Sequence, residues 1–105
     1  MAFNGTEGDP IDLNSAITMT SRFRTDFPNE IQGFYIGSAA INDILNQSNC
    51  VGIRIYNAIN DFGKKTLVFV GVDTNESDMT SGVIIDKVLP CPPHCSKSVL
   101  NETED

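Results

Sequence analysis

The residues with the clearest chemical potential are the three cysteines and the single histidine. Cys91, His94 and Cys95 stand together in the segment LPCPPHCSK, whose prolines restrict the backbone. With Cys50 they make a Cys₃His set, a composition found in structural zinc sites. However, the strands expected between Cys50 and Cys91 place these two residues at opposite ends of a sheet. Eight strand residues span roughly 26 Å, whereas a Zn–S bond measures about 2.3 Å. We therefore expect no cofactor, zinc being the one candidate.

Cys91 and Cys95 allow three other interpretations. A disulfide needs Cα atoms about 5.5 Å apart, and the intervening prolines permit this separation. A redox pair would need a thiolate of low pKa, which a charged His94 could favour, although the spacing differs from the C-x-x-C motif of thioredoxin-type proteins. In the third interpretation, the prolines shape a tight turn and the thiols pack as small apolar groups. We expect the third, because a cytosolic chain is kept reduced.

A second set of polar residues lies on and after the strands. Arg54 and Tyr56 are two residues apart, so in a strand they point to one face. Asp73 and Asp78 belong to the loop DTNESDMTSG, which opens like an EF-hand loop. That match fails, because Asp78 stands where glycine is required and Ile84 where the bidentate glutamate is required. We expect the four polar residues to line a ligand-binding pocket. Alternatively, the two aspartates alone could form a weak cation site.

Two helices are predicted in the first half of the chain. Asp9-Pro10 has the composition of a helix start, and Pro28 ends the helix. Its apolar residues recur at spacings of three and four, as in an amphipathic helix that needs a surface to pack on. These residues are Leu13, Ala16, Ile17, Thr20, Phe23 and Phe27. A short extended piece begins at Gly33, and a second, shorter helix follows, with Ser38 as its N-cap and Asn46 at its end.

The following segments predict an antiparallel sheet. Apolar residues alternate in CVGIRIYNAIN, as in a half-buried strand. Residues 66–72 are apolar at nearly every position, so this strand should be central or covered on both faces. The turn residues NDFG join the two into a hairpin over 50–72, and GVIIDKV predicts a third strand over 82–88. The fold class is α+β, with two N-terminal helices packed on this small antiparallel sheet.

Length and charge limit the organisation and the partners. The 105 residues suit one domain, which we place at 9–96, between a disordered N-terminus (1–8) and an acidic flexible tail (97–105). Aspartate and glutamate outnumber lysine and arginine 14 to 7, giving a net charge of −7. Such a surface repels phosphate backbones and anionic lipid, so we expect neither a nucleic acid nor a membrane as partner. Since no apolar run has transmembrane length, we expect a soluble cytoplasmic protein.

Three stretches carry a resemblance to known sequences: ILNQSNCVGIRIYNAIN, TLVFVGVDTNESDM and CPPHC. Over about residues 13–96 the chain resembles a family of small uncharacterised bacterial proteins, to which no activity, substrate or cofactor is attached. The resemblance implies a bacterial, cytoplasmic setting, and it places His94 in a variable position. It also marks the positions to test, which are Cys50, Arg54, Tyr56, Asp73, Asp78, Cys91 and Cys95.

Two functional hypotheses follow from these features. The first is a non-catalytic interaction or small-ligand-binding module, with an unknown protein or a second copy of the chain as partner. It is favoured because the single histidine leaves few ways to assemble an acid–base or nucleophilic set. The alternative is a small thiol- or metal-dependent enzyme, or a redox sensor, that uses Cys91 and Cys95.

Overall fold

The structure is a computed structural model that describes residues 2–101. Its residues group into two compact units that alternate along the chain. The first unit is built from residues 2–8 and 36–88, and the second from residues 9–35 and 89–101. Met1 and the last four residues of the expected acidic tail lie outside the described residues. No helix in the described chain is long and apolar enough to cross a bilayer.

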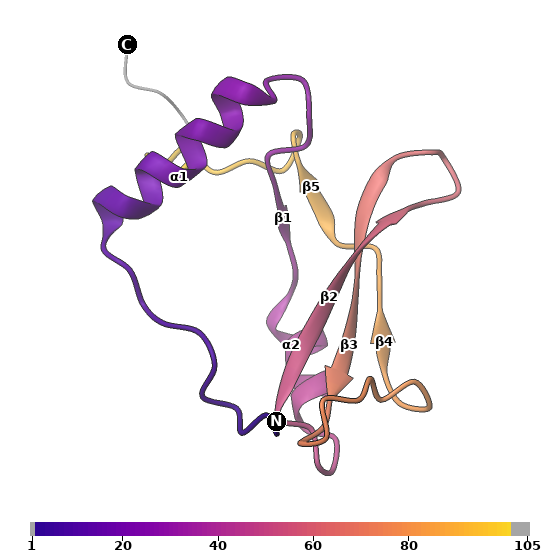
Figure 1. Ribbon diagram of the computed structural model, residues 1–105. Helices are drawn as coiled ribbons and strands as arrows, with labels where there is room; N and C mark the ends of the chain where they lie inside the picture. The colour runs from indigo at the N-terminus through magenta and orange to yellow at the C-terminus, as the bar shows by residue number, and fades with distance from the viewer. Residues whose placement is uncertain (1, 102–105) are drawn as a thin grey trace. The chain divides into compact units, whose positions relative to one another are not determined.

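The first unit contains the predicted hairpin. Helix α2 (Ser38–Leu45) precedes strands β2 (Gly52–Ile59), β3 (Lys65–Val72) and β4 (Ile84–Ile85), which form an antiparallel sheet in the order β2-β3-β4 (Figure 1). The hairpin register is continuous over the full length of both strands. The α+β class and the hairpin are therefore confirmed.

The third strand is shorter than predicted. It was expected over 82–88, but only Ile84 and Ile85 pair with β3. Lys87 has a φ of 59°, in the left-handed region, so the chain cannot continue as a regular strand at this point. At the other end, a Cβ atom on Gly82 would lie 2.0 Å from Oε1 of Gln47, so a larger residue there would displace the Gln47 side chain. The same Gln47 oxygen accepts a hydrogen bond from the Val83 N–H at 2.8 Å.

Strand β3 lies at the centre of this unit and is covered on both faces, as its unbroken apolar sequence predicted. On one face, a Cβ atom on Gly71 would be 3.3 Å from the Ile44 side chain of α2. Ile44 is 0% exposed. On the other face, Val70 and Val72 are 4% and 3% exposed. The core of the unit therefore forms around the second half of β3.

The second unit holds the longer helix and a sheet that the sequence did not reveal. Helix α1 (Leu13–Asp26) is followed by β1 (Gly33–Tyr35), which pairs antiparallel with β5 (Leu89–Cys91). The short extended piece at Gly33 is confirmed. Its partner was not predicted, because three residues containing a proline carry no alternation of apolar and polar side chains.

The start of α1 differs from the prediction by three residues and that of α2 by one. The N-cap of α1 is Asp12, whose carboxylate accepts a hydrogen bond from the Ser15 N–H at 2.7 Å, so the predicted cap at Asp9 is wrong. Helix α2 starts at Ser38 itself, with Gly37 as its cap. A carboxylate that reaches the free N–H groups of the first turn fixes the start more strongly than a nearby proline does.

The packing of the apolar stripe of α1 on the three-stranded sheet stays a prediction, because α1 and that sheet belong to different units. No residue of α1 is buried, and Leu13 is 58% exposed. Phe23 and Phe27 pack on one another, with ring centroids 5.0 Å apart. Arg24 donates a hydrogen bond to the Leu100 carbonyl at 2.6 Å, which fastens the helix to the segment after β5.

We predict that Ile44→Ala lowers the free energy of unfolding by about 2–5 kcal/mol, because it leaves a cavity in the core of the first unit. Urea denaturation followed by circular dichroism measures this change. The control is Ile59→Ala, since Ile59 is 67% exposed. It should cost less than about 1 kcal/mol. Equal losses in the two variants would contradict the position assigned to Ile44.

Candidate functional site

Three of the four predicted polar site residues meet on one face of the first unit. Arg54 and Tyr56 of β2 both reach Asp78. Arg54 Nη1 donates to one carboxylate oxygen of Asp78, forming an ion pair, and the Tyr56 hydroxyl donates to the other. The shared face of Arg54 and Tyr56 is confirmed, because a single carboxylate engages both.

Asp78 approaches Arg54 and Tyr56 from the far side of the central strand. It forms an isolated antiparallel bridge with Val72, on the edge of β3 that faces away from β2. Its side chain must therefore reach across the face of β3 that carries Val70 to bond the two β2 residues. This cluster of Arg54, Tyr56 and Asp78 lies over one half of the core.

Mutual bonding fixes the charge states of the cluster. The pKa of Asp78 is lowered, chiefly by the hydrogen bond from the Tyr56 hydroxyl and further by the Arg54 guanidinium. The pKa of Tyr56 is raised, chiefly because its hydroxyl is bonded to the Asp78 carboxylate. At neutral pH Asp78 is ionised and Tyr56 is protonated. The arrangement therefore holds a fixed pattern of donors and charges.

Residues of the N-terminal segment contact the cluster. Phe3 donates its N–H to the Thr74 carbonyl at 3.1 Å. Its ring lies beside the Arg54 guanidinium, with Cζ 5.9 Å from the ring centroid, a cation–π distance. The Glu7 carboxylate accepts hydrogen bonds from the Asn4 and Gly5 N–H groups, each at 3.0 Å. These contacts give residues 3–7 a defined course.

Asp73, the fourth predicted residue, shapes the loop instead of joining the cluster. One oxygen of its carboxylate accepts hydrogen bonds from the N–H groups of Asn75 and Ser77, at 2.9 and 3.1 Å. The loop closed in this way delivers Asp78 to the sheet. A cation site shared by Asp73 and Asp78 gains no support, because no group of three His, Cys, Asp or Glu residues within 2–101 is arranged to hold a metal.

A groove of about 610 Å³ lies beside the cluster. Its walls are mainly apolar, and its two charged side chains are Glu7 and Arg54. The lining residues are Phe3, Gly5, Glu7, Leu45, Val51, Gly52, Ile53, Arg54, Ile55 and Val72. Phe3, Glu7 and Leu45 were missed at the sequence level. The one sequence feature that could have indicated their role was Phe3, an aromatic residue in a mainly polar N-terminal segment.

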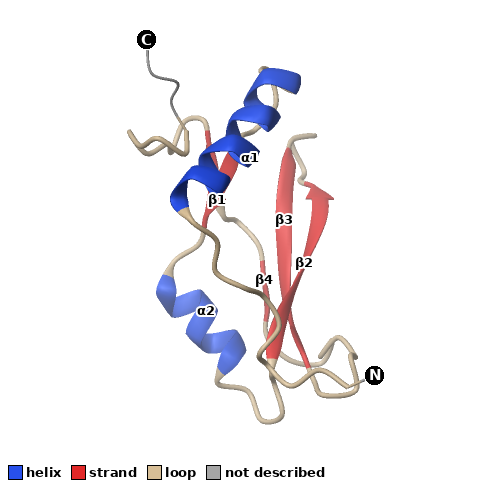
Figure 2. Cartoon of the chain, turned by 60° about the vertical axis from the view of Figure 1, so that its left-hand side comes forward, coloured by secondary structure: helices blue, strands red, loops and turns tan. Residues whose placement is uncertain are grey.

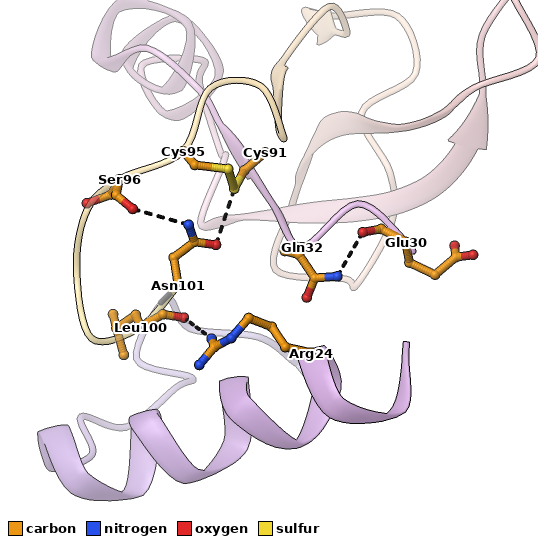
Figure 3. The surroundings of a disulfide bond; sticks show 8 residues. All are labelled: Arg24, Glu30, Gln32, Cys91, Cys95, Ser96, Leu100 and Asn101. Carbon is orange, nitrogen blue, oxygen red and sulfur yellow. Dashed lines mark hydrogen bonds between the residues drawn. A yellow bond between two sulfur atoms is a disulfide. The ribbon is translucent and has the colours of Figure 1, made fainter. Parts of the chain in front are cut away.

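The second unit carries the cysteine pair, and Cys91 and Cys95 are joined by a disulfide (Figure 3). The expected turn is present, since the His94 N–H donates to the Pro90 carbonyl at 2.9 Å. The expectation of two free thiols in this turn is wrong, because the turn brings the Cα atoms to 4.7 Å, within the range of natural disulfides. Of the interpretations considered, the structure contains the disulfide.

The surroundings of the disulfide join three segments of the second unit. The Asn101 amide donates to the Ser96 carbonyl at 3.1 Å, and its oxygen lies 3.3 Å from the sulfur of Cys91 (Figure 3). We treat the latter as a contact, since a disulfide sulfur carries no proton to donate. The Gln32 N–H donates to the Cys91 carbonyl at 2.7 Å. The disulfide therefore sits where β1, β5 and the C-terminal segment meet.

The disulfide removes two of the four ligands proposed for a Cys₃His zinc site. Cys50 belongs to the first unit and is a free, half-buried thiol that donates to the Gly52 carbonyl at 3.3 Å. Disulfide sulfurs of Cys91 and Cys95 are not thiolates and cannot supply the usual zinc–thiolate bonds. The exposed His94 is left as the other residue of the set.

Comparison of the chain with protein-family models, curated proteins and solved structures gave no significant match. The resemblance to small bacterial proteins therefore stays a prediction.

We predict that Asp78→Asn lowers stability at neutral pH, and that the difference from the unchanged protein disappears in acid. Because the folded-state pKa of Asp78 is lowered, its ionised form stabilises the fold above the pKa of the unfolded chain. This contribution is lost as the pH falls through the folded pKa. Urea midpoints measured from neutral pH to strong acid follow the effect.

Asp61→Asn serves as the control, because Asp61 lies exposed in the hairpin turn. It removes one carboxylate from the same unit without touching the cluster, so its effect should be small at every pH. A difference between Asp78→Asn and the unchanged protein that stays constant with pH would contradict the ionic role of Asp78.

Proposed function

We propose that the protein is a non-catalytic binding module whose ligand occupies the groove beside Arg54. The observation that carries this proposal is the groove itself, lined by Phe3, Leu45 and the first half of β2. Its volume of about 610 Å³ falls within the range of about 300–1,000 Å³ typical of ligand pockets. Such pockets combine apolar walls with a few fixed polar groups, and Arg54 and Glu7 take that part here.

The chemistry of the cluster favours recognition over catalysis. A general acid or base works best with a pKa near the working pH. Here the pKa of Asp78 is moved down and that of Tyr56 is moved up, in each case chiefly by the hydrogen bond between them. Both shifts lead away from neutrality. The cluster instead holds the Arg54 guanidinium in place at the groove, which serves the orientation of a ligand.

We predict saturable binding of Nile red, an uncharged dye whose fluorescence rises in apolar surroundings. Leu45→Gln should weaken this binding, because it places an amide on an apolar wall of the groove. The matched control is Ile59→Gln, which changes an exposed isoleucine outside the groove and should leave the affinity unchanged. A fluorescence titration measures both. Non-saturable binding, or equal losses in the two variants, would count against a ligand site in the groove.

The disulfide favours a second candidate function, a redox sensor built on Cys91 and Cys95. The sequence suggested a bacterial cytoplasmic protein, and disulfides in that compartment are usually transient and either catalytic or redox-sensing. In an oxidising compartment the same bond would be a structural link between β5 and the segment that follows it. The reduction potential of the pair separates these possibilities.

The redox hypothesis predicts half-reduction of the pair at about −180 to −270 mV, the range of thiol–disulfide exchange proteins. The protein is equilibrated in glutathione or dithiothreitol buffers, alkylated, and its mass measured. Cys50→Ser removes the free thiol, so that only the pair is counted. A potential below about −300 mV is typical of structural disulfides and would exclude the sensor.

A further inference from the structure

Strand β2 forms an open edge of its sheet. The strand order is β2-β3-β4, so in the described chain one side of β2 pairs with β3 and the other pairs with no strand (Figure 2). Edge strands are usually protected by brevity, proline, several charges or a bulge. β2 is eight residues long, contains no proline and one charged residue, and its register with β3 is unbroken. It lacks these protections, although the N-terminal segment lies near its start, since a Cβ atom on Gly5 would be 3.1 Å from the Val51 carbonyl oxygen.

The groove follows this edge. Five consecutive residues of the chain, 51–55, line it. Because successive strand residues point to opposite faces, a groove that touches all five is not confined to one face, and we infer that it follows the edge of β2. Val72 of β3, the partner of Gly52, also lines it. Leu45 of α2 stands beside the groove on one side, and Phe3 and Glu7 of the N-terminal segment line it as well.

The occupant that fits an edge of this kind is an extended peptide. An unpaired strand edge presents N–H and C=O groups in alternation, and another extended backbone satisfies them in series. Side chains of such a peptide would point alternately to the two faces, where the walls of the groove are mainly apolar. Five strand residues span roughly 17 Å, enough for a peptide of about that many residues.

The charges of the groove indicate a cationic group on the peptide. Arg54 is already paired with Asp78, so its charge is compensated within the protein. The Glu7 carboxylate is held by backbone N–H groups, which favour its ionised form, and the whole chain carries a net charge of −7. A second copy of the chain would bring the same negative charge and is therefore disfavoured as occupant.

We propose that the edge of β2 binds an extended peptide, rich in β-branched side chains and with a lysine or arginine that reaches Glu7. The complex would extend the sheet by one strand. This inference rests on the proposed binding function and names the class of its ligand.

Fluorescence anisotropy with three labelled peptides, a probe and two controls, tests the proposal. The probe is a hexapeptide of alternating valine and threonine with a lysine at one end. The two controls have the same side chains and charge, but one is N-methylated at the odd-numbered amides and the other at the even-numbered amides. In either binding register, one of them therefore cannot donate hydrogen bonds to the strand edge. We expect the unmethylated peptide to bind about tenfold more tightly or better than that control, since two or more hydrogen bonds are lost in it.

Glu7→Gln should weaken binding of the lysine peptide several-fold and reduce its dependence on salt, whereas Asp61→Asn should change neither. Equal affinity for the methylated and unmethylated peptides would overturn strand addition. Saturable Nile red binding without peptide binding would overturn the peptide while leaving the binding function in place. Loss of both would overturn both. Concentration-dependent dimerisation in sedimentation, without peptide binding, would assign the edge to a second copy.

Discussion

The first unit depends on one carboxylate that reaches across its central strand. Asp78 bonds Arg54 and Tyr56 of β2 from a position on the other side of β3. In doing so it fixes the loop after β3, covers the Val70 face of the core and holds the guanidinium at the groove. A buried or half-buried carboxylate is stable in such a place only when its oxygens are bonded. The two donors from β2 provide that condition, so the cluster supports the fold and the groove together.

The same arrangement explains why β3 can be apolar on both faces in so small a unit. Helix α2 covers one face through Ile44, and the loop with its cluster covers the other. β2 and β4, its neighbours, complete the shielding at the edges. In this arrangement β2 pairs with β3 on one side and, within the described chain, with no strand on the other. The open edge of β2 thus follows from the central placement of β3.

Local patterns predicted the features that depend on neighbouring residues in the sequence. The alternation in β2, the turn at NDFG and the run in β3 fixed the hairpin, and the two-residue spacing of Arg54 and Tyr56 placed them on one face. Features that depend on contacts between residues far apart in the sequence were not predicted. Phe3 and Arg54 are 51 residues apart in the sequence, and the paired residues Gly33 of β1 and Cys91 of β5 are 58 residues apart. The sequence did not distinguish Asp73 from Asp78. In the structure, the Asp73 carboxylate accepts hydrogen bonds from N–H groups of its own loop, whereas the Asp78 carboxylate bonds residues of β2.

The alternation of the two units along the chain affects how the groove comes into being during synthesis. Phe3 is synthesised before its backbone partner Thr74, which lies 71 residues further along the chain. Contacts this distant in sequence form slowly, because a long loop must close first. The nascent chain therefore exposes the edge of β2 before the N-terminal segment has a surface to fold against. Any factor that meets the chain on the ribosome encounters this edge in its least protected form.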